Sequence, residues 1–293
     1  MPELPDITVY VEALARRVVG QPLERVKLTH PFVLRTVAPP LAAFEGRSVE
    51  SVDRMGKRIV LGFGDEHWLV IHLMVAGRLN WTARTAKASR KVGLVALDFP
   101  AGTLLLTEAG SKRRASLHAV RGMAALAAHD RGGLEVLGAT QGEFALRLRH
   151  ERHTVKRALA DPRLFSGIGN AYSDEILLRA QLSPMARTDT MDDETVARLF
   201  GATRAILVEW TDRLRAEAGH KWPEKVTAFR PEMVVHGKYG QPCMVCGSPV
   251  QRIRYAENET NYCARCQTGG RLLADRALSR LLKEDWPRSL DEL

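Results

Sequence analysis

Apolar residues recur at helical spacing near the start of the chain. They are Ile7, Tyr10, Val11, Leu14 and Val18. Steps of three and four residues place such side chains on one face of a helix. Asp6 is a candidate helix cap and Gly20 is a stop signal, so the pattern predicts a helix that extends to about Val19.

Between about residues 24 and 119 the pattern changes to short runs of β-branched and other apolar residues. The runs include RIVLGF, WLVIHLMV, GLVALDF and TLLLTE. Turn signals such as Pro100-Ala101-Gly102 separate them. The pattern predicts an antiparallel sandwich that packs against the first helix.

Beyond a glycine-rich connector at residues 129–138 the apolar period becomes helical. Thr140 and Glu143 have the spacing of a capping box. The clearest helix is predicted over residues 192–215, because its apolar residues share one face. Those residues are Val196, Leu199, Phe200, Thr203, Ile206, Leu207, Trp210 and Leu214.

The last part of the chain changes character again. Residues 232–267 predict a β-hairpin around four cysteines, and residues 270–282 predict an exposed helix. A run of strands followed by a run of helices indicates the α+β fold class.

Composition places the chain among soluble globular proteins. Of its 293 residues, 45% are hydrophobic and 26% are charged, and no apolar run is long enough to span a membrane. Glu3 and Asp6 stand where a signal peptide would carry basic residues, so we expect a cytoplasmic protein, associated with the nucleoid if it is bacterial. The net charge of +9 and the pI of about 9.6 favour a polyanionic partner such as nucleic acid, although a basic protein without one is the alternative.

All four cysteines fall in one stretch. Cys243 and Cys246 form one CxxC pair, Cys263 and Cys266 form a second, and sixteen residues separate the pairs. Two such pairs complete a tetrahedral Zn²⁺ site, and with all four ligands supplied by the protein the zinc should be structural. The sequence therefore predicts one structural zinc ion that holds the hairpin together.

The chain opens with MPELPD, which places Pro2 directly behind the initiator. Removal of Met1 would leave a secondary amine. An α-amine has a pKa of about 7.7–8.0, so a useful fraction of it is a free nucleophile at pH 7. The alternative is that this stretch only begins a helix.

A glycine-rich turn lies between two helical stretches in LFSGIGNAYSDEILLRA. Asn170 can cap the second helix, and a helix N-terminus behind glycines favours anions. The turn follows a helix rather than a strand, so it does not predict a dinucleotide-binding fold. A contact to DNA phosphate fits better, with a simple interhelical turn as the alternative.

Together PELPD, GIGNAYSDEIL and the four-cysteine hairpin resemble the formamidopyrimidine-DNA glycosylase / endonuclease VIII family over roughly residues 2–267. The resemblance implies a β-sandwich catalytic domain at 1–130 and a helix–two-turn–helix DNA-binding domain at 131–230. A zinc-finger hairpin at 231–267 and a helical C-terminal extension at 268–293 complete the expected organisation.

The resemblance also implies catalytic roles for the first residues. Pro2 matches the N-terminal proline whose amine attacks C1′ of the damaged nucleotide and forms a Schiff base. Glu3 matches the carboxylate that handles protons at the deoxyribose. Asp6 stands where most members have glutamate, and is one methylene shorter.

Three further residues match family contacts to DNA. Lys57 corresponds to a lysine that grips the phosphate beside the lesion, Lys156 to a lysine near the cleft, and Asn170 to a phosphate-binding asparagine. Taken alone, either lysine would be an ordinary surface residue. The register of the surrounding motifs favours the functional interpretation.

The sequence departs from the family in the loops that read DNA. The loop AGSKRRASLHAV lacks the usual aromatic residue, so Lys112, Arg113 and Arg114 are the candidates to reach DNA there. Met74 or Val75 occupies the position that fills the space left by an extruded base.

Two more departures lie further along the chain. Asn258 stands where the hairpin usually carries a phosphate-binding arginine, and the segment GHKWPEKVTAF lacks a double-glycine loop. The tail after Cys266 is also longer than usual. The lesion preference of the family's purine-specific members therefore cannot be assumed.

The resemblance implies a monomeric bifunctional DNA glycosylase and abasic-site lyase of base-excision repair. It would act on double-stranded DNA that contains an oxidised base or an abasic site, through β,δ-elimination. The only cofactor would be the structural zinc, and no membrane would be involved. The alternative is a non-catalytic protein that binds damaged DNA or junctions and keeps the family fold.

Overall fold

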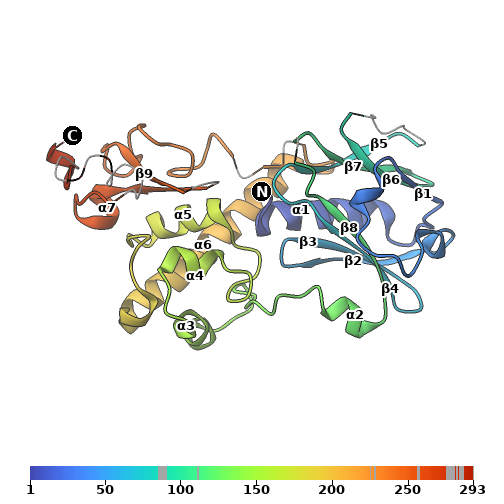
Figure 1. Ribbon diagram of the computed structural model, residues 1–293, viewed down its shortest axis with the longest axis horizontal. Coiled ribbons are helices and arrows are strands. Elements are labelled where there is room, and N and C mark those ends of the chain that lie inside the picture. Colours follow the sequence, from blue (N-terminus) through green and yellow to red (C-terminus); the bar gives the residue numbers. More distant parts are fainter. Residues whose placement is uncertain are drawn as a thin grey trace. The chain divides into compact units, whose positions relative to one another are not determined.

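The computed structural model describes residues 1–84, 91–110, 112–224, 226–227, 229–255, 258–274, 281, 283 and 287–292. Contacts divide the chain into two compact units (Figure 1). The first unit is Met1–Arg131 with Trp210–Thr227, and the second is Gly132–Glu209 with Ala228–Leu293.

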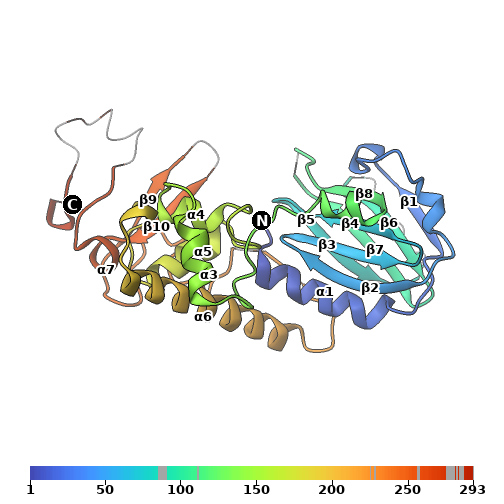
Figure 2. The ribbon, with the colours of Figure 1, turned by 90° about the horizontal axis from the view of Figure 1, so that it is seen from below.

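The first unit begins with helix α1, Leu4–Val18, which runs alongside strand β2 (Figure 2). The predicted helix is confirmed, but Asp6 is not its cap. Glu3 is the N-cap, and the two residues form a reciprocal capping box in which Asp6 Oδ2 accepts the Glu3 N–H at 2.9 Å. The helix begins earlier than expected because Pro5 fits the first turn, where its missing N–H has no helical partner.

Two four-stranded antiparallel sheets form a sandwich in the first unit, as predicted. One sheet has the order β2-β3-β4-β8, with β2 Val49–Met55, β3 Arg58–Phe63, β4 His67–His72 and β8 Ser116–Arg121. The other has the order β1-β6-β7-β5, with β1 Arg25–Leu28, β6 Gly93–Phe99, β7 Gly102–Glu108 and β5 Gly77–Thr82. The facing sides of the sheets and one side of α1 share a single apolar core.

Short helical turns complete the sandwich. They are η1 Pro31–Val33, η2 Leu41–Phe44 and helix α2 Met123–Ala127, which follows β8.

The longest helix, α6 Asp193–Ala218, confirms the helix predicted over 192–215. Its C-terminal part belongs to the first unit, where Arg215 pairs with Glu12 of α1 at 2.6 Å. The segment after α6 is fixed by Trp222, whose indole Nε1 donates to the Leu79 carbonyl at 2.9 Å.

The second unit contains three further helices, α3 Gln141–Arg149, α4 Val155–Ala160 and α5 Asn170–Arg179, and a short turn, η3 Thr188–Thr190. The predicted capping box is confirmed, because Thr140 and Glu143 bond to each other's backbone N–H at the start of α3. Helix α5 is buried on nearly every side, including its polar residues Ser173, Asp174 and Glu175.

A two-stranded antiparallel hairpin follows, with β9 Val250–Arg254, β10 Glu259–Cys263 and a short helix α7 Ala264–Thr268. This confirms the hairpin predicted around the cysteines. One side of the hairpin packs on Leu178 of α5 and on Val235.

The exposed helix predicted over residues 270–282 is wrong at its start, whereas Leu281 near its end is helical and 76% exposed. Residues 270–274 are not helical, and Leu272 and Leu273 pack on Ile253 and Tyr262 of the hairpin. Two left-handed glycines, Gly269 and Gly270, stop α7, and tertiary burial of the leucines then overrides their helical spacing.

The backbone of this extension pairs with the end of the chain. The N–H of Leu272 donates to the Arg288 carbonyl at 2.8 Å, and a short turn, η5 Leu290–Glu292, follows. Residues 275–280 and 282 of the predicted helix lie outside the described residues. No helix in the described ranges has the length and apolar character needed to span a membrane.

Candidate active site and zinc centre

The start of the chain is buried within the first unit. Glu3 and Asp6 are only 2% and 0% exposed, and Pro2 is buried beside them. Burial lowers the pKa of the Met1 α-amine, while the Glu3 and Asp6 carboxylates partly raise it. Arg78 and Lys57 also act on this amine and lower its pKa. The backbone nitrogen at the chain start therefore lies among two carboxylates and two cations.

Lys57 belongs to the same group. It lies in the turn between β2 and β3, where the left-handed Gly56 reverses the chain. Burial lowers the pKa of the Lys57 ammonium, and the nearby Glu3 carboxylate opposes this shift. The structure thus brings Pro2, Glu3 and Lys57 together from two separate segments.

This grouping has the components of nucleophilic catalysis with proton transfer. An amine whose pKa is lowered by burial is more often a free base at neutral pH. A carboxylate beside it can accept or deliver protons, and a lysine beside both can hold an anion.

The loop residues of the first unit that are candidates to contact DNA differ in exposure and in hydrogen bonding. Val75 is 56% exposed at the turn after β4, and its carbonyl accepts a hydrogen bond from Arg78 at 3.1 Å. Met74 in the same turn is half-buried and has a left-handed backbone.

The basic loop before β8 contains the three candidate cations. Arg113 donates to the Lys91 carbonyl at 2.7 Å and contacts the His30 ring. Lys112 and Arg114 are exposed beside it, and Ser111 of this loop lies outside the described residues.

In the second unit, Asn170 is the first residue of α5 rather than its cap. Gly169 occupies the N-cap position, and the Asn170 side-chain Nδ2 donates to the Glu259 carbonyl of β10 at 2.9 Å. The expectation that Asn170 caps this helix is therefore wrong. Its side chain joins the glycine-rich turn to the hairpin instead.

Lys156 contacts the backbone of Asn170. Its Nζ donates to the Asn170 carbonyl and to Ser173 Oγ, both at 3.0 Å, and to Asp174 Oδ1 at 2.5 Å. The Lys156 side chain is 11% exposed. Its ammonium thus faces the interior of the unit and holds the backbone of the glycine-rich turn.

Two neighbouring carboxylates of α5 extend this network to the hairpin. Asp174 Oδ2 accepts from His236 Nδ1 at 2.8 Å and from the Asn261 N–H at 3.2 Å. Glu175 accepts three successive backbone N–H groups of residues 234–236 at 2.9–3.0 Å. Asp174 and Glu175 were not predicted from the sequence, although adjacent acids in a helix with a buried stripe were a usable signal.

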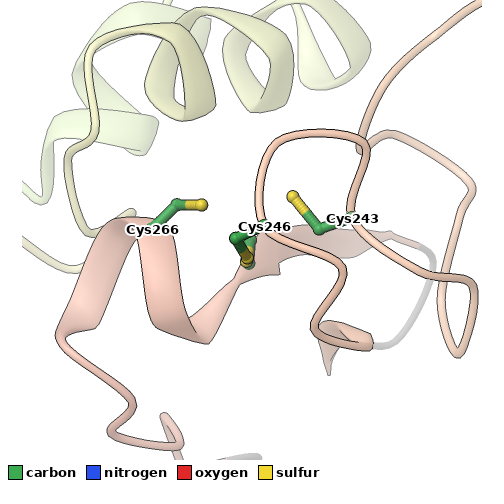
Figure 3. A group of neighbouring side chains, drawn as sticks. Cys243, Cys246 and Cys266 are labelled. Carbon is green, nitrogen blue, oxygen red and sulfur yellow. The ribbon is translucent and has the colours of Figure 1, made fainter.

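The four cysteines converge on one point, and Figure 3 shows three of them, Cys243, Cys246 and Cys266. Cys243 and Cys246 come from the loop before β9, Cys263 ends β10, and Cys266 lies in α7. Their sulfur atoms all lie within 4.8 Å of one another. Tetrahedral zinc with Zn–S bonds of about 2.3 Å requires sulfur separations of about 3.8 Å, so the arrangement fits a single structural Zn²⁺.

The thiols have unequal acidities. Burial raises the pKa of Cys263 to about 11. For Cys246, burial also opposes ionisation, but hydrogen bonds with Ser248 outweigh it and lower the pKa to about 6. Zinc would hold all four as thiolates. Among the described residues, no other group of three or more His, Cys, Asp or Glu side chains is placed to hold a metal.

Asn258 lies next to the hairpin tip. It is exposed, and its carbonyl accepts the Tyr255 N–H at 2.7 Å. Its position beyond the end of β9 is consistent with a surface contact.

The fold and the cysteine centre define a class of proteins in which a β-sandwich precedes a helical domain and a four-cysteine zinc finger. Sequence comparison agrees with each part. The formamidopyrimidine-DNA glycosylase N-terminal domain matches residues 1–116, and the H2TH domain of the same enzymes matches residues 137–213. A zinc finger found in FPG and IleRS matches residues 240–269.

Whole-chain relatives make the assignment specific. A formamidopyrimidine-DNA glycosylase of Heliobacterium modesticaldum is 30% identical over 280 residues, which cover 91% of this chain and 100% of the relative. A formamidopyrimidine-DNA glycosylase-like protein of Mycobacterium tuberculosis is 36% identical over 151 residues, covering 52% of this chain and 94% of the relative. The chain belongs to the formamidopyrimidine-DNA glycosylase family.

Solved structures have the same fold. The Lactococcus lactis Fpg in complex with DNA containing an oxidised pyrimidine matches with a TM-score of 0.80 and 25% identity. The match covers 91% of this chain and 100% of the other.

Proposed function

We propose that this protein is a DNA glycosylase of base-excision repair that also cleaves the DNA strand at the resulting abasic site. The observation that carries the proposal is the grouping of the chain-start amine with Glu3 and Lys57 in a member of this family. Its substrate would be double-stranded DNA with an oxidised base, the kind of DNA bound in the Lactococcus lactis complex.

The chemistry begins after Met1 is removed. The free amine of Pro2 attacks C1′ of the damaged nucleotide, the bond from C1′ to the base breaks, and the base leaves with a proton. Ring opening of the sugar then gives an iminium between Pro2 and C1′. This iminium is permanently charged because the amine is secondary, so it accepts electrons as the 3′ and then the 5′ phosphate leaves by β- and δ-elimination.

Neighbouring residues supply protons and position. Glu3 delivers a proton to the sugar ring oxygen and later removes one from C2′. Lys57 binds the phosphate beside the lesion. Asp6 holds Glu3 in place through the capping box at the start of α1.

DNA would be held by both units. The damaged nucleotide must leave the base stack, at an expense of a few kcal/mol that is smallest for a damaged pair. Met74, Val75 and the cations Lys112, Arg113 and Arg114 would occupy and flank the space it leaves.

In the second unit, Asn170 and Asn258 would contact phosphates, and Lys156 would support Asn170 from behind. The reduced thiols that the zinc centre needs fit a cytoplasmic protein. We propose that it acts there as a monomer.

Borohydride trapping tests this function. The wild-type protein should form a reduced covalent adduct with DNA that contains an abasic site, and should release the base from one or more oxidised lesions in a panel. Pro2→Gly should form no adduct and release no base. A form with an uncleaved N-terminal extension is the matched control, because it keeps Pro2 but converts its amine to an amide.

The results of these assays distinguish a catalytic glycosylase from a protein that only binds damaged DNA. A protein that shifts the mobility of damaged DNA but releases no base and forms no adduct would be the non-catalytic binder. Intact-mass analysis of the same preparation must show that Met1 is absent, since a retained Met1 blocks the amine.

A further inference from the structure

A second group of polar residues lies on the outer face of the sheet β2-β3-β4-β8. In the strand register, Arg58 of β3 is opposite His72 of β4, which is opposite Ser116 of β8. The residues that alternate with them, Ile59 and Ile71, are buried in the sandwich core. Arg58, His72 and Ser116 therefore face away from the core, side by side.

The polar residues on this outer face continue along β8 and into the segment after α2. His118, two residues beyond Ser116 on β8, has its Nε2 3.3 Å from Ser116 Oγ. Its ring meets the His129 ring edge to face, with centroids 4.7 Å apart. The contact fixes His129, and with it the start of the 129–131 segment, against the outer face of the sheet.

Two guanidiniums flank these histidines. Burial lowers the pKa of Arg58, and Arg131 lowers it further by repulsion. Neither guanidinium makes a hydrogen bond or an ion pair with the residues that the structure describes. Among the residues with described positions, Asp130 is the carboxylate that acts on Arg58, and it is exposed. We call Arg58, His118, His129 and Arg131 the outer-face cluster.

The histidines in this region are neutral at pH 7. Burial, with Arg58 as a second cause, lowers the pKa of His72 to about 4. Burial and then His129 lower the pKa of His118 to about 4. Neutral imidazoles next to arginines supply N–H donors without adding to the repulsion between the cations.

Two neighbouring guanidiniums that have no ion-pair partner among the described residues repel each other, and a bound anion would reduce this repulsion. Phosphate oxygens accept both guanidinium and imidazole N–H groups, and charge-assisted bonds of this kind are the strong ones. The cluster also borders the candidate active site, because Lys57 is the residue before Arg58 and also acts on His72.

We propose that the outer-face cluster binds a backbone phosphate of the DNA strand beyond the phosphate held by Lys57. This rests on the proposed function, since it takes Lys57 to mark the path of the damaged strand. The strand would then follow the outer face of the sheet from the chain start towards the 129–131 segment.

Salt dependence of binding gives the first test. Affinity for a duplex with an unreactive abasic-site analogue is measured at several salt concentrations for the wild type, Arg58→Ala, Arg131→Ala and the double variant. Each lost phosphate contact should make the slope of log K against log salt less steep by about one. Affinity at low salt should fall about tenfold for each arginine.

The matched control is Arg16→Ala. Arg16 is an exposed arginine of α1 in the same unit, with no part in the outer-face cluster. Arg16→Ala removes the same charge from the protein but no proposed phosphate contact. The slope of log K against log salt for this variant should therefore equal that of the wild type.

An uncharged substitute for single phosphates can locate the phosphate that the cluster contacts. Methylphosphonate, which carries no charge, replaces one phosphate at a time along the damaged strand. At one position beyond the lesion phosphate it should weaken wild-type binding about tenfold and leave Arg58→Ala unaffected. Coupling of this kind assigns that phosphate to the cluster.

Three results would overturn the proposal. The Arg58 and Arg131 variants could behave as Arg16→Ala does, or no methylphosphonate position could couple to Arg58. Inorganic phosphate could instead bind in a cluster-dependent manner while the DNA slopes stay unchanged, which would make this a site for the free ion. These are binding measurements, so a wild type that binds damaged DNA but forms no adduct would refute the proposed catalysis and leave this test intact.

Discussion

At the scale of single residues, Glu3 has two roles that its position makes compatible. Its carboxylate takes part in the capping box that starts α1, and it also acts on Lys57 and on the α-amine of the chain. The helix thus fixes the catalytic candidate in a buried place, where its charge acts strongly on its neighbours.

We expect Glu3→Gln to preserve the helix and slow base release. Glutamine keeps an oxygen that accepts the Asp6 N–H, but it cannot transfer a proton to the sugar. General acid–base catalysis contributes about 10²–10⁴-fold, so single-turnover excision should slow by at least about a hundredfold. The urea unfolding midpoint should stay the same. Wild-type excision by this variant would limit Glu3 to its structural role.

The buried pair of Lys156 and Asp174 should be sensitive to loss of one partner. Asp174→Asn leaves the Lys156 ammonium buried without its carboxylate, and breaking such a pair costs about 3–5 kcal/mol of unfolding free energy. Urea denaturation should show this loss, and the double variant Lys156→Met, Asp174→Asn should recover part of it. The exposed pair of Asp189 with Arg187 supplies the control, since Asp189→Asn should lower the unfolding free energy much less than Asp174→Asn does. Equal stability of Asp174→Asn and wild type would contradict the role of the pair.

Some residue contacts were open to sequence analysis and others were not. Cysteine spacing predicted the zinc ligands because each CxxC pair is a local unit. The role of Asn170 as a cap was predicted wrongly because its side chain bonds to Glu259, which lies far away in the sequence. Pairing of Asp174 with His236 likewise depends on the tertiary fold.

At the scale of elements, local pattern predicted the sandwich, the long helix and the hairpin. Alternating apolar runs and turn signals define strands, and one apolar face defines α6. The C-terminal extension shows where local pattern fails. Its Leu272 and Leu273 are buried against Ile253 and Tyr262, and Tyr262 Oη accepts the Leu273 N–H at 2.8 Å.

We expect the extension to stabilise the zinc hairpin. Leu273→Asp would place a charge against this apolar contact, so the amides of β9 and β10 should exchange faster with deuterium and zinc should pass more quickly to a chelator. Leu281→Asp is the control, because Leu281 is 76% exposed. Equal exchange and zinc-release rates in the two variants would argue against a stabilising role.

At the scale of the whole molecule, the two units contain different candidate sites. The first contains the amine, Glu3, Lys57 and the half-buried histidines, and the second contains the cysteine cluster and Asn170. The division of chemistry between units was implied by the family resemblance rather than by pattern. The outer-face cluster was missed because its members come from two strands and a connecting segment.

The histidines predict an acid-sensitive first unit. In the folded protein the pKa of His72 and of His118 is about 4, against 6.5 for a free side chain. Between these values the unfolded chain binds protons that the folded chain does not, so stability should fall as pH drops from 6.5 to 4. Urea midpoints at pH 7 and pH 4.5, followed by the tryptophans of the first unit, check this. His118→Gln should reduce the dependence of the urea midpoint on pH. A wild-type midpoint that is the same at both pH values would contradict this prediction.

The most direct test of the central claim is to locate the covalent bond to DNA. The protein is reduced with borohydride on abasic-site DNA, digested, and the peptide that carries the sugar is sequenced by mass spectrometry. We expect the labelled peptide to start at Pro2 and to carry the sugar on the Pro2 nitrogen. An adduct on Lys57, a half-buried lysine whose lowered pKa makes it a competing amine, would contradict this assignment.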